Sequence, residues 1–240
     1  MMKIVICNLK NGLDKRKNSV FSDELLNIKN SDIELVIAPS IPFISFYDGF
    51  GYKLGSQDIS SFTDSNITGE IVGEQLVSLG CKYVIVGHSD RRINNNEINI
   101  NFINKINNAQ ECGLKIIYCI GESLSDRENN NHFNVLEQQI SEVLNNVDSK
   151  NIVIAYEPAF TKNDDRNLNF DEIVETIQYI KDITFDKYEI NFKVIYGGKI
   201  DKGLLEDLKD IKIINGYLID NDDNQTNTIK DLLSTFDSQK

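Results

Sequence analysis

The chain has 240 residues, 40% of them hydrophobic, and a formal net charge of -12 at pH 7. This length suits one α/β barrel, and the composition is that of a folded globular protein, so we expect a single domain over residues 1–240. Nucleic acids and anionic membranes attract basic surfaces, and the negative charge therefore argues against both as partners.

Short apolar runs recur along the chain, separated by stretches with helical periodicity. The runs are Lys3–Cys7, Glu34–Ala38, Tyr52–Gly55, Lys82–Gly87, Lys115–Ile120, Ile152–Tyr156, Phe192–Tyr196 and Lys212–Ile219. Most are rich in Val and Ile and lack polar alternation, which is typical of strands buried on both faces. The sequence therefore predicts parallel strands inside a layered fold.

Two of the intervening stretches show the helical spacing most clearly. Apolar residues recur three and four positions apart at Phe170, Ile173, Val174, Ile177 and Ile180, and again at Ile229, Leu232, Leu233 and Phe236. Asp171 and Glu172 stand in the expected first turn of the former, where the helix dipole favours negative charge. Both stretches are predicted to be amphipathic helices.

Strict alternation of strands and helices predicts a parallel sheet with right-handed crossovers. Eight strands spaced about 30 residues apart fit βα units with short loops, and eight strands can close into a barrel. We therefore predict a single (β/α)8 barrel. A doubly wound open sheet is the alternative, because periodicity alone does not separate the two.

The cysteines and histidines bear on metal binding and on the compartment. The cysteines are Cys7, Cys81, Cys112 and Cys119. None forms a C-x-x-C pair, and the histidines are His88 and His132 alone, so we expect no metal site. Free buried thiols fit a reducing compartment. No apolar stretch reaches the roughly 18 residues of a membrane span, and we expect a cytoplasmic protein.

Three chemically capable side chains follow predicted strands. Lys10 comes after the first strand, His88 after the fourth and Glu157 after the sixth. Each alone is compatible with a solvated loop or a strand cap. In a parallel barrel the active site forms at the carboxyl ends of the strands, where all three would converge. A base and two donors are what proton abstraction beside a carbonyl requires.

Six short motifs occur in order along the chain, namely N-L-K at 8–10, I-T-G-E-I at 67–71, V-I-V-G-H-S-D-R-R at 84–92, Y-C-I-G-E at 118–122, I-A-Y-E-P at 154–158 and Y-G-G at 196–198. They resemble motifs of the triosephosphate isomerase family. The family segments are usually written N-W-K, F-T-G-E-I, V-I-L-G-H-S-E-R-R, A-C-I-G-E, A-Y-E-P and Y-G-G-S. Each match alone is weak, whereas six in order across nearly the whole chain are a strong signal.

The resemblance implies a cofactor-free proton transfer between adjacent carbons through an enediolate. In the family's established mechanism Glu157 would be the general base and His88 the neutral electrophile. Lys10 would stabilise the enediolate oxygen, and Asn8 would hydrogen-bond at the same oxygens. The substrate would be a small triose phosphate.

The resemblance also implies supporting roles. Ser89 and Asp90 flank His88, and Asp90 stands where the family has glutamate, which keeps the charge and shortens the reach by one methylene. Arg91 and Glu97 resemble a structural ion pair beneath the site. The loop at 68–70, Thr68-Gly69-Glu70, resembles the segment that inserts into a partner subunit, so a homodimer is expected.

The phosphate-binding loops depart from the family pattern. The residues at the matching positions are Asn163, Gly197, Gly198, Lys199, Asp220 and Asn221. The lid after Glu157 and Pro158 lacks the family's glycines, a lysine replaces the serine of Y-G-G-S, and the G-G turn after the eighth strand is lost. Carboxylates near a phosphate weaken its binding.

We expect the chain to interconvert glyceraldehyde 3-phosphate and dihydroxyacetone phosphate, a step of glycolysis and gluconeogenesis. The altered loops leave two alternatives. One is a catalytically impaired or inactive member of the family with a binding or structural role. The other is an isomerase for a non-phosphorylated substrate.

Overall fold

The computed structural model describes residues 2–25, 33–47, 51–63, 66–162, 166–221 and 226–237. Within these residues the strands form a closed parallel barrel in chain order, and β1 pairs with β8. The strands are β1 (Lys3–Asn8), β2 (Ile33–Ala38), β3 (Lys53–Ser56), β4 (Cys81–Val86), β5 (Lys115–Ile120), β6 (Ile152–Tyr156), β7 (Lys193–Tyr196) and β8 (Gly216–Asp220). The predicted (β/α)8 barrel is confirmed, and closure excludes the open sheet.

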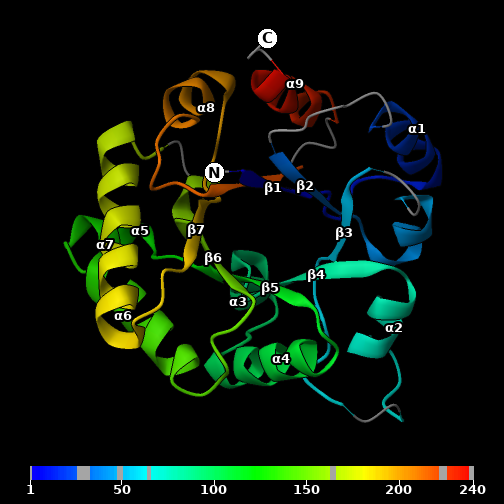
Figure 1. Cartoon of the computed structure of the whole chain (residues 1–240), viewed down its shortest axis with the longest axis horizontal. Coiled ribbons are helices and arrows are strands. Elements are labelled where there is room, and N and C mark those ends of the chain that lie inside the picture. The colour runs from blue at the N-terminus through cyan, green and yellow to red at the C-terminus, as the bar shows by residue number, and fades with distance from the viewer. Residues whose placement is uncertain are drawn as a thin grey trace.

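Helices surround the ring of strands (Figure 1). They are α1 (Lys15–Leu25), α2 (Gly73–Ser78), α3 (Ser89–Asn94), α4 (Asn99–Glu111), α5 (Leu124–Glu128), α6 (His132–Leu144), α7 (Phe170–Tyr188), α8 (Lys202–Leu208) and α9 (Thr226–Asp237). Two short 3-10 helices, η1 (Ile41–Tyr47) and η2 (Ala159–Lys162), follow β2 and β6. Both amphipathic helices expected from the sequence are present, as α7 and α9.

The beginning of α7 shows local sequence setting an element boundary. Asn169 Oδ1 accepts a hydrogen bond from the Glu172 backbone N–H at 2.9 Å, and Glu172 Oε2 accepts one from the Asn169 N–H at 2.9 Å. This reciprocal pair satisfies two amide groups that have no partner within the helix. The helix ends at Tyr188, and the left-handed φ of 55° at the next residue, Glu189, stops the helical path.

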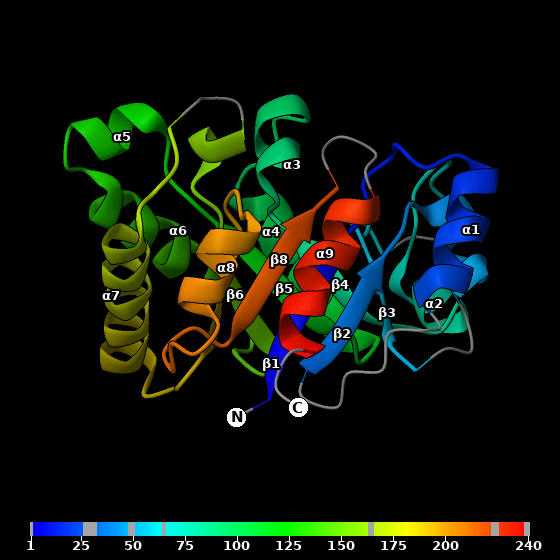
Figure 2. The same cartoon turned by 90° about the horizontal axis from the view of Figure 1, so that it is seen from above.

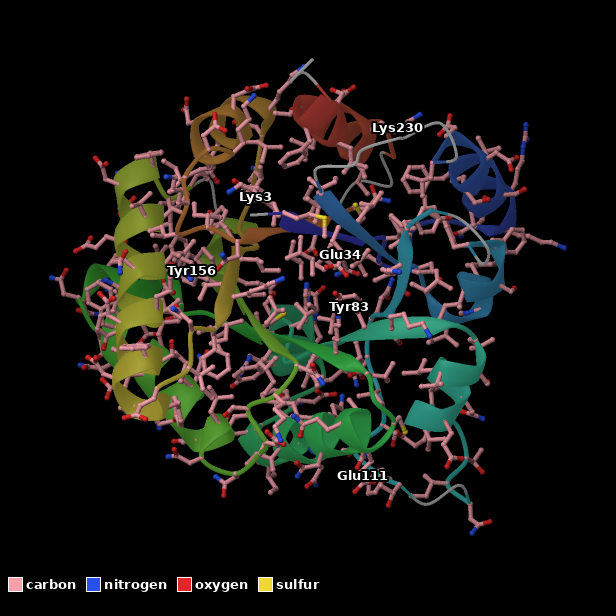
Figure 3. All side chains as sticks on the ribbon, viewed as in Figure 1. Lys3, Glu34, Tyr83, Glu111, Tyr156 and Lys230 are labelled. Carbon is pink, nitrogen blue, oxygen red and sulfur yellow. The ribbon has the colours of Figure 1, made fainter. Side chains whose placement is uncertain are left out.

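The strands are covered by apolar side chains on both faces. Alternate strand residues point into the barrel and pack together as Ile4, Ile6, Val36, Ala38, Tyr83, Ile85, Ile117, Cys119, Val153, Ala155, Ile195 and Leu218. The other strand residues face the helices in a second, larger cluster. Figure 3 shows Tyr83 and Glu34 near the centre of the ring, where the Tyr83 hydroxyl donates to Glu34 Oε1 at 2.7 Å. Burial on both faces explains the continuous Val and Ile runs.

The last strand starts later than the sequence predicted. The expected run covers Lys212–Ile219, whereas β8 begins at Gly216 and the residues before it form a turn. A Cβ at Gly216 would lie 1.8 Å from the Ile4 carbonyl oxygen, so only glycine permits this approach to β1. The apolar run from Lys212 to Ile219 does not show this close approach, so it did not predict where β8 begins.

The arrows of β8 and β2 point toward the edge of the barrel where α3 and α5 lie, whereas β1 begins at the opposite edge (Figure 2). Residues that follow strands therefore gather on a single face. Among the described residues, no helix combines the length and apolar character needed to cross a membrane.

Lys3 at the base of β1 is a partly buried cation. Its Nζ donates to the backbone carbonyls of Ile211 at 3.0 Å and Ile214 at 2.8 Å, in the turn before β8. Burial lowers the pKa of Lys3 to about 8, although Asp210 acts in the opposite direction. The ammonium form is thus disfavoured in the folded state relative to the unfolded chain.

This depressed pKa gives a pH-dependent stability. Between about pH 8 and the ordinary lysine value of 10.5 the unfolded chain binds the extra proton, so stability rises with pH across this window. From pH 8 to pH 10.5, we expect the free energy of unfolding of the wild type to rise by roughly 1–2 kcal/mol more than that of Lys3→Met, after discounting for partial exposure. Urea unfolding at pH 7.5, 9 and 10.5 measures this. Lys193→Met, which removes an exposed lysine of β7, should show no such trend.

Candidate active site

Four polar side chains from four strand ends meet at the barrel mouth. Asn8 and Asp220 are the last residues of β1 and β8, while His88 and Glu157 follow β4 and β6. His88 Nε2 lies 3.4 Å from Glu157 Oε1, 3.2 Å from Asp220 Oδ2 and 3.4 Å from Asn8 Nδ2. The side chains of His88, Glu157 and Asp220 are 5% or less exposed. These three side chains are therefore shielded from solvent and crowded with charge.

The tautomer of His88 follows from its position as the N-cap of α3. The backbone N–H of Asp90 donates to His88 Nδ1 at 3.1 Å, so this nitrogen carries no proton. The proton of the neutral ring then sits on Nε2, which faces the carboxylates and the centre of the site. His88 is thereby held as a neutral hydrogen-bond donor.

Glycines allow the Glu157 backbone and side chain to reach their places. A Cβ at Gly121 would lie 1.8 Å from the Glu157 carbonyl oxygen, and one at Gly197 would lie 2.9 Å from Glu157 Cγ. The Glu157 N–H donates to the Ile120 carbonyl at 2.7 Å, which extends the β5–β6 pairing by one step. The Ser89 N–H reaches Glu157 Oε2 at 3.4 Å, leaving Oε1 toward His88.

Lys10 enters the site on a strained loop. Its φ is 47°, in the left-handed region, and Gln57 Nε2 donates to its carbonyl oxygen at 2.9 Å. Its Nζ lies 3.3 Å from Asp220 Oδ2 and 3.4 Å from Asp90 Oδ2. A non-glycine residue in this conformation costs energy, and such strain tends to persist at functional positions.

A network of four charges lies behind the site. Arg91 Nε donates to Glu97 Oε1 at 2.8 Å, and Arg91 also pairs with Asp58 at 2.9 Å. Lys105 Nζ lies 2.6 Å from Asp58 and 2.7 Å from Glu97. Burial raises the pKa of the Asp58 carboxyl, against the opposite effect of the Lys105 ammonium. The Arg91–Glu97 pair expected from the resemblance is thus in contact, as part of a larger network.

Sequence reasoning missed Lys105, which is 3% exposed. It lies on α4 three residues after Phe102, on the helix face that also buries Ile106 and Ala109. A lysine on the apolar face of an amphipathic helix is a readable signal, because a buried ammonium needs a carboxylate partner.

The residues expected near phosphate occupy two neighbouring turns. Gly197 and Gly198 are buried after β7, and Lys199 is exposed, with its backbone N–H 3.3 Å from Thr161 Oγ1 in η2. The backbone N–H of Asn221 donates to the Asn8 carbonyl at 2.9 Å. Asn163 lies outside the described residues. Asp220 turns its carboxylate toward His88 and Lys10.

The loop expected to meet a partner subunit is on the surface. Thr68, Gly69 and Glu70 are all exposed, and Gly69 has a left-handed φ of 87°.

A cleft of about 590 Å³ lies at the barrel mouth and is large enough for a small substrate. Its lining includes Asn8, Lys10, His88 and Asp90.

His88, Glu157 and Asp220 also satisfy the spacing of a metal site, because their ligand atoms lie within 4.8 Å of one another. The ring nitrogen facing this cluster is the protonated Nε2, and a metal ligand must be an unprotonated nitrogen. The Lys10 ammonium already provides a cation beside Asp220. The arrangement suits proton transfer better than metal binding.

Beside Glu157, a buried ion pair between Glu122 and Arg127 follows β5 and contacts Tyr156 at the end of β6. Arg127 Nε donates to Glu122 Oε1 at 2.9 Å, and the Tyr156 hydroxyl donates to the same oxygen at 3.0 Å. Glu122 is 0% exposed and Arg127 is 7% exposed. Burial raises the pKa of Tyr156, with the Glu122 charge acting in the same direction.

The fold and this cluster place the chain in the class of (β/α)8 barrels that carry a carboxylate, an imidazole and an ammonium together at the strand ends. The sequence model of the triosephosphate isomerase family matches residues 3–235. The chain belongs to the triosephosphate isomerase family.

Relatives bearing that name support the assignment. The triosephosphate isomerase of Geotalea uraniireducens is 32% identical over 204 residues, covering 80% of this chain and 81% of the relative. That of Pseudoalteromonas translucida is 31% identical over 205 residues, covering 82% of each. That of Amoebophilus asiaticus is 35% identical over 173 residues, covering 69% of this chain and 68% of the relative. The similarity spans most of the barrel.

The Glu122–Arg127 pair gives a stability prediction. Arg127→Met leaves a buried carboxylate without its cation and should lower the free energy of unfolding by about 3–5 kcal/mol. The double variant Arg127→Met with Glu122→Met should regain part of this loss, because no charge is left buried. Urea unfolding curves measure both.

The exposed pair of Lys187 and Glu137, at 2.7 Å, is the matched control. Lys187→Met should cost less than about 1 kcal/mol. An Arg127→Met variant as stable as Lys187→Met would contradict the importance of the buried pair.

Proposed function

We propose that the chain catalyses the interconversion of glyceraldehyde 3-phosphate and dihydroxyacetone phosphate, as its family membership supports. The observation that carries the proposal is the convergence of Glu157, His88 and Lys10 on one barrel mouth. The Glu157 and His88 side chains lie 3.4 Å apart, and the cation of Lys10 reaches the same cluster. A base and oxyanion donors thus flank one small volume.

Glu157 is the general base of this proposal. It takes the proton from the carbon next to the carbonyl, the electron pair moves onto the carbonyl oxygen, and an enediolate results. The same carboxyl then returns the proton to the neighbouring carbon, so no atom or electron is gained or lost and no cofactor is needed. Its side chain is 1% exposed, which keeps competing water away.

His88 and Lys10 stabilise the enediolate. The protonated Nε2 of the neutral imidazole donates to the oxygen where charge develops, and the tautomer is already set by the Asp90 N–H. A preorganised donor in a dry site costs no reorganisation during the reaction. Asn8 adds a further donor through Nδ2, and Lys10 adds positive charge.

Phosphate recognition in this proposal falls to the two turns after β7 and β8. The exposed Lys199 provides charge, and Gly198 allows close backbone approach. Asn221 is 4% exposed, and its Nδ2 has no hydrogen-bond partner among the described residues. This amide is a donor that a phosphate oxygen would satisfy. Asn163 would contribute from the lid.

We also propose a homodimer in the cytoplasm. The exposed loop Thr68–Glu70 supports the first part, because a surface loop is available to a second subunit. The cysteines support the second part, because Cys7, Cys81 and Cys119 are buried free thiols and Cys112 is also free. Burial raises the pKa of Cys7 to about 12, so this thiol resists oxidation.

Glu157→Gln tests the base. Because an amide cannot accept the carbon-bound proton, we expect kcat for glyceraldehyde 3-phosphate to fall by about 100- to 10,000-fold. A coupled assay of dihydroxyacetone phosphate formation measures this. Glu111→Gln, which alters an exposed carboxyl at the end of α4, should leave kcat unchanged. If the wild type turns over glyceraldehyde 3-phosphate no faster than Glu157→Gln does, the proposed activity is contradicted. The two alternatives, a non-catalytic role and a non-phosphorylated substrate, would then remain.

Lys199→Ala tests the phosphate contact. Loss of one charged hydrogen-bond donor should raise KM about tenfold or more, with a smaller effect on kcat. Steady-state kinetics measure both constants, and Lys202→Ala at the exposed start of α8 serves as the control. Equal KM values in Lys199→Ala and Lys202→Ala would remove Lys199 from the phosphate site.

A further inference from the structure

Asp220 has an unusual place for a carboxylate. It is the last residue of β8 and lies opposite Asn8 in the register of β1 and β8. Its side chain is 4% exposed and turns into the barrel mouth. The family pattern has glycine at this position, so the carboxylate is a feature of this chain.

The contacts of Asp220 are with the groups assigned above to the enediolate oxygen. Asn8 Nδ2 donates to Oδ1 at 2.9 Å, while His88 Nε2 and Lys10 Nζ lie 3.2 Å and 3.3 Å from Oδ2. The Asn8 contact has the length of a charge-assisted hydrogen bond, and the Lys10 contact is within ion-pair distance. The Asp220 carboxylate therefore occupies the place that the proposed mechanism gives to substrate oxygens.

We propose that Asp220 is a specificity-determining residue that fills the oxyanion subsite of Asn8, Lys10 and His88 until substrate displaces it. This inference rests on the proposed function for its kinetic consequence only. An anion that binds only at these three donors must compete with the Asp220 carboxylate for them. Because that carboxylate is attached to the protein, its effective concentration at the donors is very high. A triose phosphate has a second anchor, its phosphate, and binding there helps to displace the side chain.

In this proposal the Asp220 side chain moves and its backbone stays in place. The backbone at Asp220 is held by strand pairing, and the next residue, Asn221, donates its N–H to the Asn8 carbonyl. Rotation of the carboxylate away from His88 leaves Lys10 paired with Asp90 at 3.4 Å. Small carboxylates and inorganic anions are thereby kept from the donors, whereas a doubly anchored substrate is admitted.

The kinetic test compares Asp220→Gly with the wild type. Removing the competing carboxylate should raise kcat/KM for glyceraldehyde 3-phosphate roughly tenfold to several hundredfold. Asp220→Asn removes the charge and keeps an oxygen acceptor for Asn8, so it should give a smaller rise. Asp207→Asn, which removes the same charge from the exposed face of α8, should match the wild type. Each of these proteins is also assayed with Glu157→Gln added, and the rate of that combined variant is the baseline for turnover that does not depend on Glu157.

A binding test does not depend on turnover. Acetate carries the same planar carboxylate as Asp220 and should enter the space that Asp220→Gly vacates. The chain has two histidines, so imidazole NMR resolves His88 directly, with His132 on α6 as the reference for folding. We expect acetate to shift the His88 signals saturably in Asp220→Gly and leave them unchanged in the wild type.

The outcomes separate the inference from the proposed function. If no variant turns over triose phosphate but acetate shifts His88 only in Asp220→Gly, the subsite assignment stands and the proposed function fails. Equal acetate shifts in wild type and Asp220→Gly, or none in either, would overturn the assignment. A kcat/KM of Asp220→Gly at or below that of the wild type, with Glu157-dependent turnover in both, would also overturn it.

Discussion

The parallel pairing of β1 with β8 is the contact on which the rest of the structure depends. It closes the sheet, and it sets Asn8 opposite Asp220 at the barrel mouth. Without closure the ends of β4 and β6 would lie far from those of β1 and β8, and His88 and Glu157 would share no volume with Lys10. The approach of the two strands in turn requires glycine at Gly216, where any side chain would collide with the Ile4 carbonyl.

Charge placement in this barrel is a compromise between stability and chemistry. The buried carboxylates at the mouth are held near one another by the imidazole proton of His88 and the ammonium of Lys10. Behind them, the two carboxylates of Asp58 and Glu97 pair with the two cations of Arg91 and Lys105, so this network adds no net charge to the site. At the mouth itself, the carboxylates of Glu157, Asp220 and Asp90 face one ammonium among the described residues, that of Lys10.

Much of the architecture could be predicted before the structure was considered. The Val- and Ile-rich runs predicted the strands because a strand covered on both faces has no polar side to show. Lys10, His88 and Glu157 could be placed on one face because parallel strands end at one edge. The ion-pair partners of Lys105 and the inward turn of Asp220 could not be predicted, since both depend on which side chains arrive from distant parts of the chain. Hydrophobic periodicity carries no information about such partners.

The sequence by itself therefore determined the order of strands and helices, the family, and the chemical types of the residues at the strand ends. These properties are local, because they depend on spacing and composition along the chain. Tertiary structure alone decided that the barrel closes, that His88 carries its proton on Nε2, and that Asp220 rests among Asn8, Lys10 and His88. The physical reason is that hydrogen bonds and ion pairs of buried groups are set by distances across the barrel, which join residues as far apart as Asn8 and Asp220.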